Sequence, residues 1–195
     1  MALSGETQVV KHFKHIDSPL GQILLVSDGR NLTGLYFVGQ KYAGQPSNDW
    51  VSDPNGDPFP DAERELIEYF AGKRRAFDLP LAPDGTAFQL RVWRAIAAIP
   101  CGRTISYAAL AQSLGAPRSI RAAAAATGRN PISIVVPCHR VVGSDGSLTG
   151  YAGALERKRR LLALETEARS VASSRRSAEL KGQPHWNMAD TEGAG

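Results

Sequence analysis

The sequence predicts an α/β N-terminal domain over residues 1–85 and an α-rich C-terminal domain with a helix-turn-helix over residues 86–165. Three observations predict this arrangement. Strand-like apolar runs and one helix fill the first half, whereas helices joined by short glycine-containing turns dominate the second half. Beyond residue 165 the chain is rich in Ser, Arg, Glu and Gly with little periodicity, so residues 166–195 are predicted to be a disordered tail.

The N-terminal elements are predicted from apolar alternation and from turn residues. Asp28-Gly29 lies between two apolar runs, and Asp-Gly is a strong signal for a hairpin turn. Asp61 is predicted to cap a helix that ends at Gly72. Strands are predicted over residues 9–16, 21–26, 32–38 and 75–81.

The C-terminal domain contains the pattern of a helix-turn-helix. Thr86 is predicted to cap one helix, and Ser106 a second one over residues 107–114. A short glycine-containing turn leads to a third helix over residues 120–126, which carries Arg121. Many helical hairpins share this pattern, so DNA binding and a plain hairpin both stay open. The alanine run of the third helix reflects either helix propensity alone or a smooth face that approaches DNA closely.

Positive charge is concentrated in the C-terminal domain. Residues 100–165 contain nine of the 23 Lys and Arg residues but only three of the 19 Asp and Glu residues. A basic region of this kind favours a polyanion such as DNA as partner, although a solvated basic face explains it as well.

Composition excludes several classes of protein. The chain has no uninterrupted apolar run of about 18 residues, so nothing predicts a membrane span, and its first residues do not resemble a signal peptide. Two cysteines do not make a disulfide framework, and with four scattered histidines they show no metal-ligand spacing. We expect a cytoplasmic protein that carries no metal and no cofactor.

One cysteine stands at a place typical of a nucleophile. Residues 132–136 are rich in β-branched residues and predict a buried strand, which Pro137 ends. Cys138 follows beside His139, whose imidazole can remove the thiol proton directly or through water. The alternative is that Cys138 is only a small buried apolar residue. Glu165 could orient the imidazole, although spacing alone favours a carboxylate on a helix surface.

Several short segments stand in the order found in one known family. They are Asp17-Ser18-Pro19-Leu20-Gly21, Ile105-Ser106-Tyr107, Arg121-Ala122, Gly128-Arg129-Asn130-Pro131, Pro137-Cys138-His139-Arg140-Val141 and Thr149-Gly150-Tyr151-Ala152-Gly153. With these segments the chain resembles the methylated-DNA–protein-cysteine methyltransferases, also called O6-alkylguanine-DNA alkyltransferases, over residues 9–165. The segment around the cysteine is the most specific of them.

The resemblance implies a direct-reversal DNA repair enzyme of which each molecule acts once. Its N-terminal domain would be RNase H-like and its C-terminal domain winged-helix-like. Cys138 would accept the alkyl group from O6-alkylguanine, and from O4-alkylthymine as well, in an irreversible and stoichiometric transfer. His139 would act as the base through a water, and Glu165 would hold His139. Asn130 would brace the turn that bears Cys138.

The resemblance also implies how the protein meets its partner, double-stranded DNA, through the minor groove. Arg121 would fill the gap that a flipped nucleotide leaves, with Ala122 beside it on the helix. Tyr107 would crowd the adjoining phosphate and donate a hydrogen bond to the guanine ring. We expect a monomer in solution, with cooperativity on DNA left open. The guanine pocket would be formed by Tyr107, Val141, Tyr151 and Ala152.

Two other functions stay open. A non-catalytic relative that binds alkylated DNA would lack the nucleophile, so the presence of Cys138 argues against it. A transcription regulator with a helix-turn-helix would leave Asn130 and the segment from Pro137 to Val141 without a role.

Overall fold

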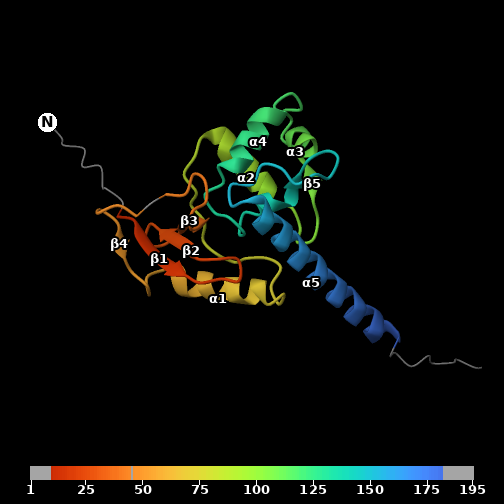
Figure 1. Cartoon of the computed structure of the whole chain (residues 1–195), viewed down its shortest axis with the longest axis horizontal. Helices are drawn as coiled ribbons and strands as arrows, with labels where there is room; N and C mark the ends of the chain where they lie inside the picture. The colour runs from red at the N-terminus through yellow and green to blue at the C-terminus, as the bar shows by residue number, and fades with distance from the viewer. Residues whose placement is uncertain (1–9, 45, 182–195) are drawn as a thin grey trace, which may run out of the picture.

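The computed structural model describes residues 10–44 and 46–181 of the chain (Figure 1). An α/β domain comes first and a helical domain follows, so the predicted fold class is confirmed. The boundary between the two domains at residues 85 and 86 stays a prediction.

The N-terminal domain is a small sheet with one helix packed on it. Its strands are β1 (His12–Ile16), β2 (Ile23–Ser27), β3 (Leu32–Phe37) and β4 (Val51–Ser52). Their order is β3-β2-β1-β4, with antiparallel pairs except for β4, which runs parallel to β1. The helix α1 (Phe59–Phe70) lies beside the sheet and buries Phe59, Leu66 and Tyr69 (Figure 1).

The C-terminal domain consists of helices around two very short parallel strands. Its elements are α2 (Ala87–Ala97), β5 (Ile105–Ser106), α3 (Tyr107–Ser113), α4 (Ile120–Gly128), the 3-10 turn η1 (Cys138–Arg140), β6 (Val141–Val142) and α5 (Leu155–Lys181). α3 and α4 form the predicted helix-turn-helix, with Gly115 in the turn at a φ of 69° that favours glycine. The predicted caps at Thr86 and Ser106 are confirmed, since each side chain accepts an N–H from the first turn of its helix.

One apolar core joins the two domains. Buried side chains of β2, β3 and α1 belong to the same cluster as those of α2, α3 and the segment before Cys138. Two backbone hydrogen bonds reinforce this junction: the Leu35 N–H donates to Pro131 O at 2.8 Å, and the Ser133 N–H donates to Leu35 O at 2.9 Å. The sheet edge at β3 therefore fastens the chain that leads into Cys138.

The predicted strand over residues 132–136 is wrong, although the segment is buried as expected. It forms a single bridge, from Ile132 to Leu35, and then turns, with Ile134 in the left-handed conformation at a φ of 71°. The reason is local hydrogen bonding. Asn130 accepts the Ile132 N–H and donates to Val136 O, so its side chain satisfies groups that a neighbouring strand would otherwise pair.

Two further predictions fail in part within the N-terminal domain. Residues 75–81 do not form a strand but make one bridge, between Leu81 and Leu32. The helix predicted to start after Asp61 begins earlier, at Phe59, with Pro58 before it. Proline suits a helix start because its missing N–H has no partner there in any case. Asp61 instead lies in the first turn.

The predicted disordered tail is wrong for residues 166–181, which continue α5, while residues 182–195 lie outside the described part of the chain. Extending an existing helix adds one hydrogen bond per residue, and this stretch is rich in Ala, Glu and Arg, which favour helix. None of the helices in the described part is both long enough and apolar enough to cross a membrane.

Candidate active site

Cys138 is the first residue of the turn η1 and lies buried, with 6% of its surface exposed. The Asn130 side chain holds this turn. Its amide Nδ2 donates to Val136 O at 2.7 Å and contacts Cys138 Sγ at 3.1 Å, while its Oδ1 accepts the Ile132 N–H at 3.0 Å. One side chain thus closes the loop and touches the thiol.

Burial raises the pKa of the Cys138 thiol, and the Asn130 contact and the nearby Lys158 charge offset only part of this effect. The resting group is therefore a protonated thiol. A thiolate is the nucleophilic form, so a neighbouring base must take the proton before Cys138 can react.

His139 has the properties of such a base. It is fully buried, and its Nε2 lies 2.8 Å from Glu165 Oε1. Burial lowers the pKa of His139, while Glu165 opposes this effect, so the imidazole is neutral at neutral pH. An ionised carboxylate only accepts hydrogen bonds, which places the imidazole proton on Nε2. The other nitrogen, Nδ1, is buried and makes no hydrogen bond to a described residue, so it keeps a free lone pair.

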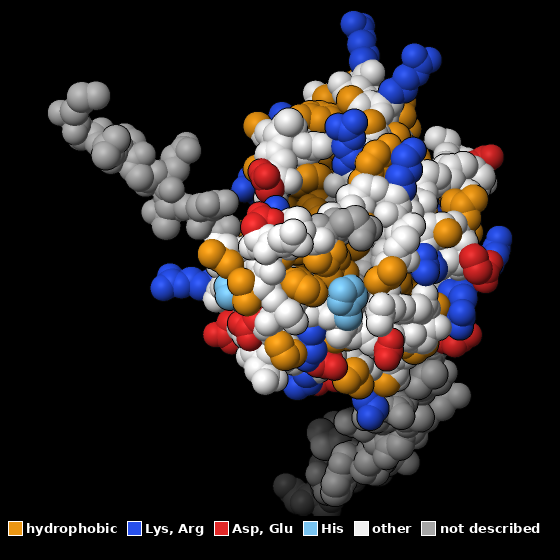
Figure 2. Space-filling model, turned by 60° about the vertical axis from the view of Figure 1, so that its left-hand side comes forward, with side chains coloured by type: hydrophobic (Ala, Val, Ile, Leu, Met, Phe, Trp, Pro, Cys, Tyr) orange, Lys and Arg blue, Asp and Glu red, His pale blue; other side chains and the backbone are white. Residues whose placement is uncertain are grey.

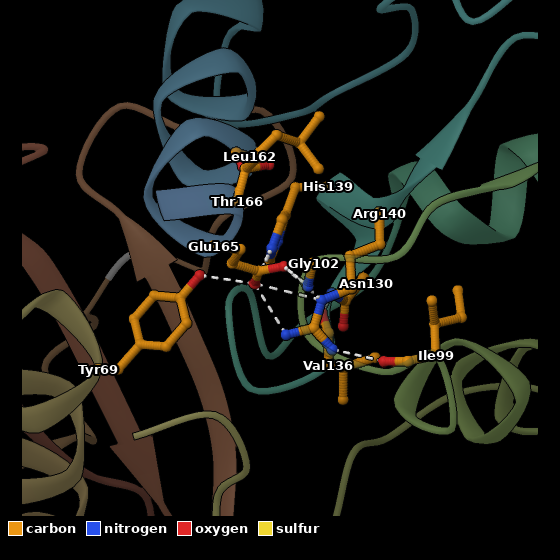
Figure 3. Close-up of polar contacts among 10 residues, drawn as sticks. All are labelled: Tyr69, Ile99, Gly102, Asn130, Val136, His139, Arg140, Leu162, Glu165 and Thr166. Atoms are coloured by element: carbon orange, nitrogen blue, oxygen red, sulfur yellow. Dashed lines mark hydrogen bonds and ion pairs between the residues drawn. The ribbon is translucent and has the colours of Figure 1, made fainter. Parts of the chain in front are cut away.

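Glu165 lies on α5 with 1% of its surface exposed and receives donors from four residues (Figure 3). Burial alone would raise its pKa, but the hydrogen bonds from His139 and Arg140 lower it well below the ordinary range. Arg140 donates from Nη2 to Oε1 at 2.8 Å and from Nε to Oε2 at 2.9 Å. The Gly102 N–H donates to Oε2 at 2.9 Å, and the Tyr69 hydroxyl donates to Oε1 at 2.8 Å. The surface position that spacing favours is therefore wrong.

A second group of residues, Tyr107, Val141 and Lys158, lies near the thiol. The parallel pairing of β5 with β6 sets Ile105 opposite Val141, so Tyr107 begins α3 close to Val141. Lys158 of α5 donates from Nζ to Val141 O at 2.6 Å and to Thr149 O at 2.8 Å. The Tyr107 hydroxyl also donates to Thr149 O, at 3.1 Å.

Tyr151 and Ala152 lie on the loop that precedes α5. Burial raises the pKa of Tyr151 well above its ordinary value, and the neighbouring Cys138 raises it further. The phenol therefore stays neutral. Its buried hydroxyl makes no hydrogen bond to a described residue. The Ala152 carbonyl accepts the Lys41 N–H at 3.1 Å, which attaches this loop to the N-terminal domain.

Arg121 and Ala122 are exposed near the start of α4 and are not part of this buried group. In Figure 2, several Lys and Arg side chains project from the upper end of the molecule, the end at which α3 and α4 lie in Figure 1. The exposed position of Arg121 suits contact with an external polyanion rather than a role beside Cys138. No three His, Cys, Asp or Glu side chains of the described residues gather closely enough to hold a metal ion.

Sequence reasoning missed three residues of the site, namely Tyr69, Arg140 and Lys158. Lys158 had a usable signal in the sequence, because Lys158, Leu161 and Glu165 follow the spacing of one helix face. In the structure all three are buried on α5. Burial lowers the pKa of Lys158 to about 8, and the nearby Cys138 counteracts this. Arg140 lies within the segment from Pro137 to Val141, but its role appears only once the fold places Glu165 beside it.

Comparisons with known proteins match both halves of the chain. Residues 11–83 match the ribonuclease-like domain of 6-O-methylguanine DNA methyltransferase, and residues 87–167 match its DNA binding domain. The first description agrees with the RNase H-like fold that the resemblance implies. A methylated-DNA–protein-cysteine methyltransferase of Methanosarcina barkeri (strain Fusaro / DSM 804) is 47% identical over 154 residues, which cover 79% of this chain and 96% of the relative.

Relatives from Mycobacterium tuberculosis are similar in sequence and in structure. The methylated-DNA–protein-cysteine methyltransferase of strain ATCC 25618 / H37Rv is 48% identical over 155 residues, which cover 79% of this chain and 92% of the relative. The crystal structure of Mycobacterium tuberculosis OGT in complex with DNA has a TM-score of 0.75 and 45% identity, and the match covers 80% of this chain and 94% of that chain.

We predict that Glu165→Gln lowers the free energy of unfolding by about 3 kcal/mol at neutral pH, because it leaves the buried Arg140 charge without its counter-ion. The folded protein lowers the pKa of Glu165, so the stability from this group is fully present above 4.5, the ordinary value. That stability is lost as the pH falls further. Urea unfolding at neutral pH and in acid measures the difference between the two proteins.

The matched control is Glu156→Gln, which removes an exposed carboxylate from the same helix and should change the free energy of unfolding by less than about 0.5 kcal/mol. A wild-type advantage over Glu165→Gln that does not shrink in acid would contradict the role given to Glu165.

We predict that Lys158→Met slows the methylation of Cys138 by methyl iodide about tenfold at neutral pH, because losing the nearby positive charge raises the pKa of the thiol further. Both proteins carry Cys101→Ser, so that Cys138 is the only thiol left. Mass spectrometry follows the added methyl group. Lys73→Met, which removes an exposed lysine, should leave the rate unchanged. Equal rates for the two lysine variants would show that the Lys158 charge does not act on the thiol.

Proposed function

Because the chain belongs to the 6-O-methylguanine DNA methyltransferase family, we propose that it repairs DNA directly by moving the alkyl group of O6-alkylguanine onto its own Cys138. The observation that carries this proposal is a buried thiol braced by Asn130 and followed immediately by the His139–Glu165 pair. This arrangement supplies a nucleophile, a base and a group that orients the base. Direct transfer needs no cofactor.

The transfer is one displacement at carbon. The Cys138 proton passes through a water to His139 Nδ1, which has a free lone pair. The thiolate then attacks the alkyl carbon, the bond from that carbon to guanine O6 breaks, and its electron pair stays with the guanine. Glu165 stabilises the imidazolium that forms, through the hydrogen bond to Nε2. The product is a thioether with no group able to displace the sulfur, so each molecule acts once.

The residues beside the thiol would hold the guanine. The carbonyls of Cys138 and Val141 would accept its exocyclic amine, and Tyr107 would donate to its ring. Val141 O already accepts from Lys158, but a carbonyl oxygen has two lone pairs, so a second donor can bind. Tyr151 and the backbone of Ala152 would contact the O6 side. In the resting protein the Tyr107 hydroxyl donates to Thr149 O, and it would exchange that partner for guanine.

DNA recognition is assigned to α4. Its exposed start would enter the minor groove, where Arg121 would occupy the place of the flipped nucleotide and Ala122 would lie close to the DNA. Flipping costs a few kcal/mol, which pocket contacts and Arg121 together offset. We further propose that a monomer binds, that O4-alkylthymine is a second substrate, and that the protein acts in the cytoplasm.

The proposal predicts that DNA carrying a labelled methyl group on guanine O6 transfers label to the protein up to one equivalent and no further. Cys138→Ser should abolish the transfer and leave DNA binding unchanged, because a hydroxyl is far less acidic than a thiol. Peptide mapping by mass spectrometry locates the added group. If label leaves the DNA well beyond one equivalent per protein, the protein does not act only once. If the wild type binds the DNA but transfers no label, the non-catalytic alternative is favoured.

A second prediction separates DNA handling from chemistry. Arg121→Ala should slow repair of duplex DNA about tenfold while its reaction with free O6-methylguanine stays near that of the wild type, since the free base needs no flipping. Arg30→Ala removes an equally exposed charge from the N-terminal hairpin and controls for net charge. Equal losses on duplex and on free base would remove the role proposed for Arg121.

A further inference from the structure

We propose that Tyr69 is a positioning residue for the alkyl transfer, because its hydroxyl holds the Glu165 carboxylate in the orientation in which Oε1 accepts the hydrogen bond from His139. This inference rests on the proposed function and adds to it a contribution from the N-terminal domain. Tyr69 belongs to α1, 96 positions away from Glu165 in the sequence, and its hydroxyl donates to Glu165 Oε1 at 2.8 Å. Figure 3 shows the phenol reaching the carboxylate from the side opposite Arg140.

One oxygen atom is shared between three donors. Glu165 Oε1 receives the Tyr69 hydroxyl, His139 Nε2 and Arg140 Nη2, each at 2.8 Å. Arg140 Nε also donates to Oε2 at 2.9 Å, so the guanidinium binds the carboxylate in a bidentate manner. The terminal torsion of a glutamate is soft, and a cation in this geometry draws both oxygens toward itself. The Tyr69 hydroxyl opposes that movement and keeps Oε1 beside the imidazole.

A neutral donor suits this position better than a second cation would. His139 becomes an imidazolium when it takes the Cys138 proton, and another positive charge at the carboxylate would oppose that step. The Tyr69 proton itself does not move during the transfer. Burial and the adjacent Glu165 raise the pKa of Tyr69 far above its ordinary value, so the hydroxyl stays a donor throughout.

The apolar core of the N-terminal domain fixes the hydroxyl in space. Tyr69 has 1% of its surface exposed, and its ring packs against Phe70 and Phe77 with centroid distances of 5.5 and 5.4 Å. A ring held on these sides does not swing, so the hydroxyl position is set by packing rather than by the site. The N-terminal domain therefore orients the catalytic base through one phenol.

The test is the single-turnover rate of Tyr69→Phe on saturating alkylated duplex DNA. We expect the rate constant to fall on the order of tenfold, the size of one hydrogen bond to a charged group expressed partly in the transition state. The dissociation constant for DNA and the final one equivalent of transferred methyl should not change. A purely structural role would instead lower the active fraction and leave the rate constant of the surviving molecules intact.

Two controls isolate the hydroxyl. Phe59→Leu opens space in the same apolar core at the start of α1 but leaves the Tyr69 hydroxyl and the two rings that hold it, so it should lower the melting temperature without changing the rate constant. In a Glu165→Ala background, which removes both acceptor oxygens, Tyr69→Phe should have no further effect on the rate, because the two groups act through one contact. Thermal unfolding shows first that each variant is folded.

The outcomes separate this inference from the proposed function. A wild type that transfers no methyl group refutes the proposed function before any variant is compared. If the wild type does transfer methyl groups and Tyr69→Phe has the same rate constant, only the role of Tyr69 is overturned. An equal loss of rate in Phe59→Leu would overturn that role as well, and so would a loss that persists undiminished in the Glu165→Ala background.

Discussion

The structure of the site depends on one buried carboxylate. An ionised group taken out of water costs several kcal/mol unless hydrogen bonds replace its hydration, and Glu165 has donors from Tyr69, Gly102, His139 and Arg140 in that place. These donors come from three different parts of the chain. The same contact that makes the imidazole a base therefore also ties α1, η1 and α5 together, so stability and chemistry share one group.

Burial alone works against the reaction, because it favours the neutral thiol and the neutral imidazole over the ion pair that must form. It raises the pKa of Cys138 and lowers the pKa of His139. Each developing charge has an opposite charge close by: Lys158 acts on the thiolate, and Glu165 on the imidazolium. Both compensating groups stand on α5, so one helix balances the charges on either side of the proton transfer.

Much of the architecture follows from local sequence signals, and the exceptions have specific causes. Strand pattern, turn glycines and the caps at Thr86 and Ser106 act over a few residues, so they are readable from sequence. Residues 132–136 have the composition of a strand, yet the Asn130 side chain provides the hydrogen bonds that make them a turn. Tyr69 has no local signal, because its partner lies in the other domain and only the fold brings them together.

The geometry of α5 restricts how this chain can evolve in length. Lys158 and Glu165 are seven residues apart, close to two full turns, and this spacing sets both on one buried face with Leu161 between them. A single inserted or deleted residue between them rotates one relative to the other by about 100° and moves a charge away from its counterpart. A change in length between these two positions is therefore incompatible with the charge arrangement of the site, whereas an exposed loop has no such phase to keep.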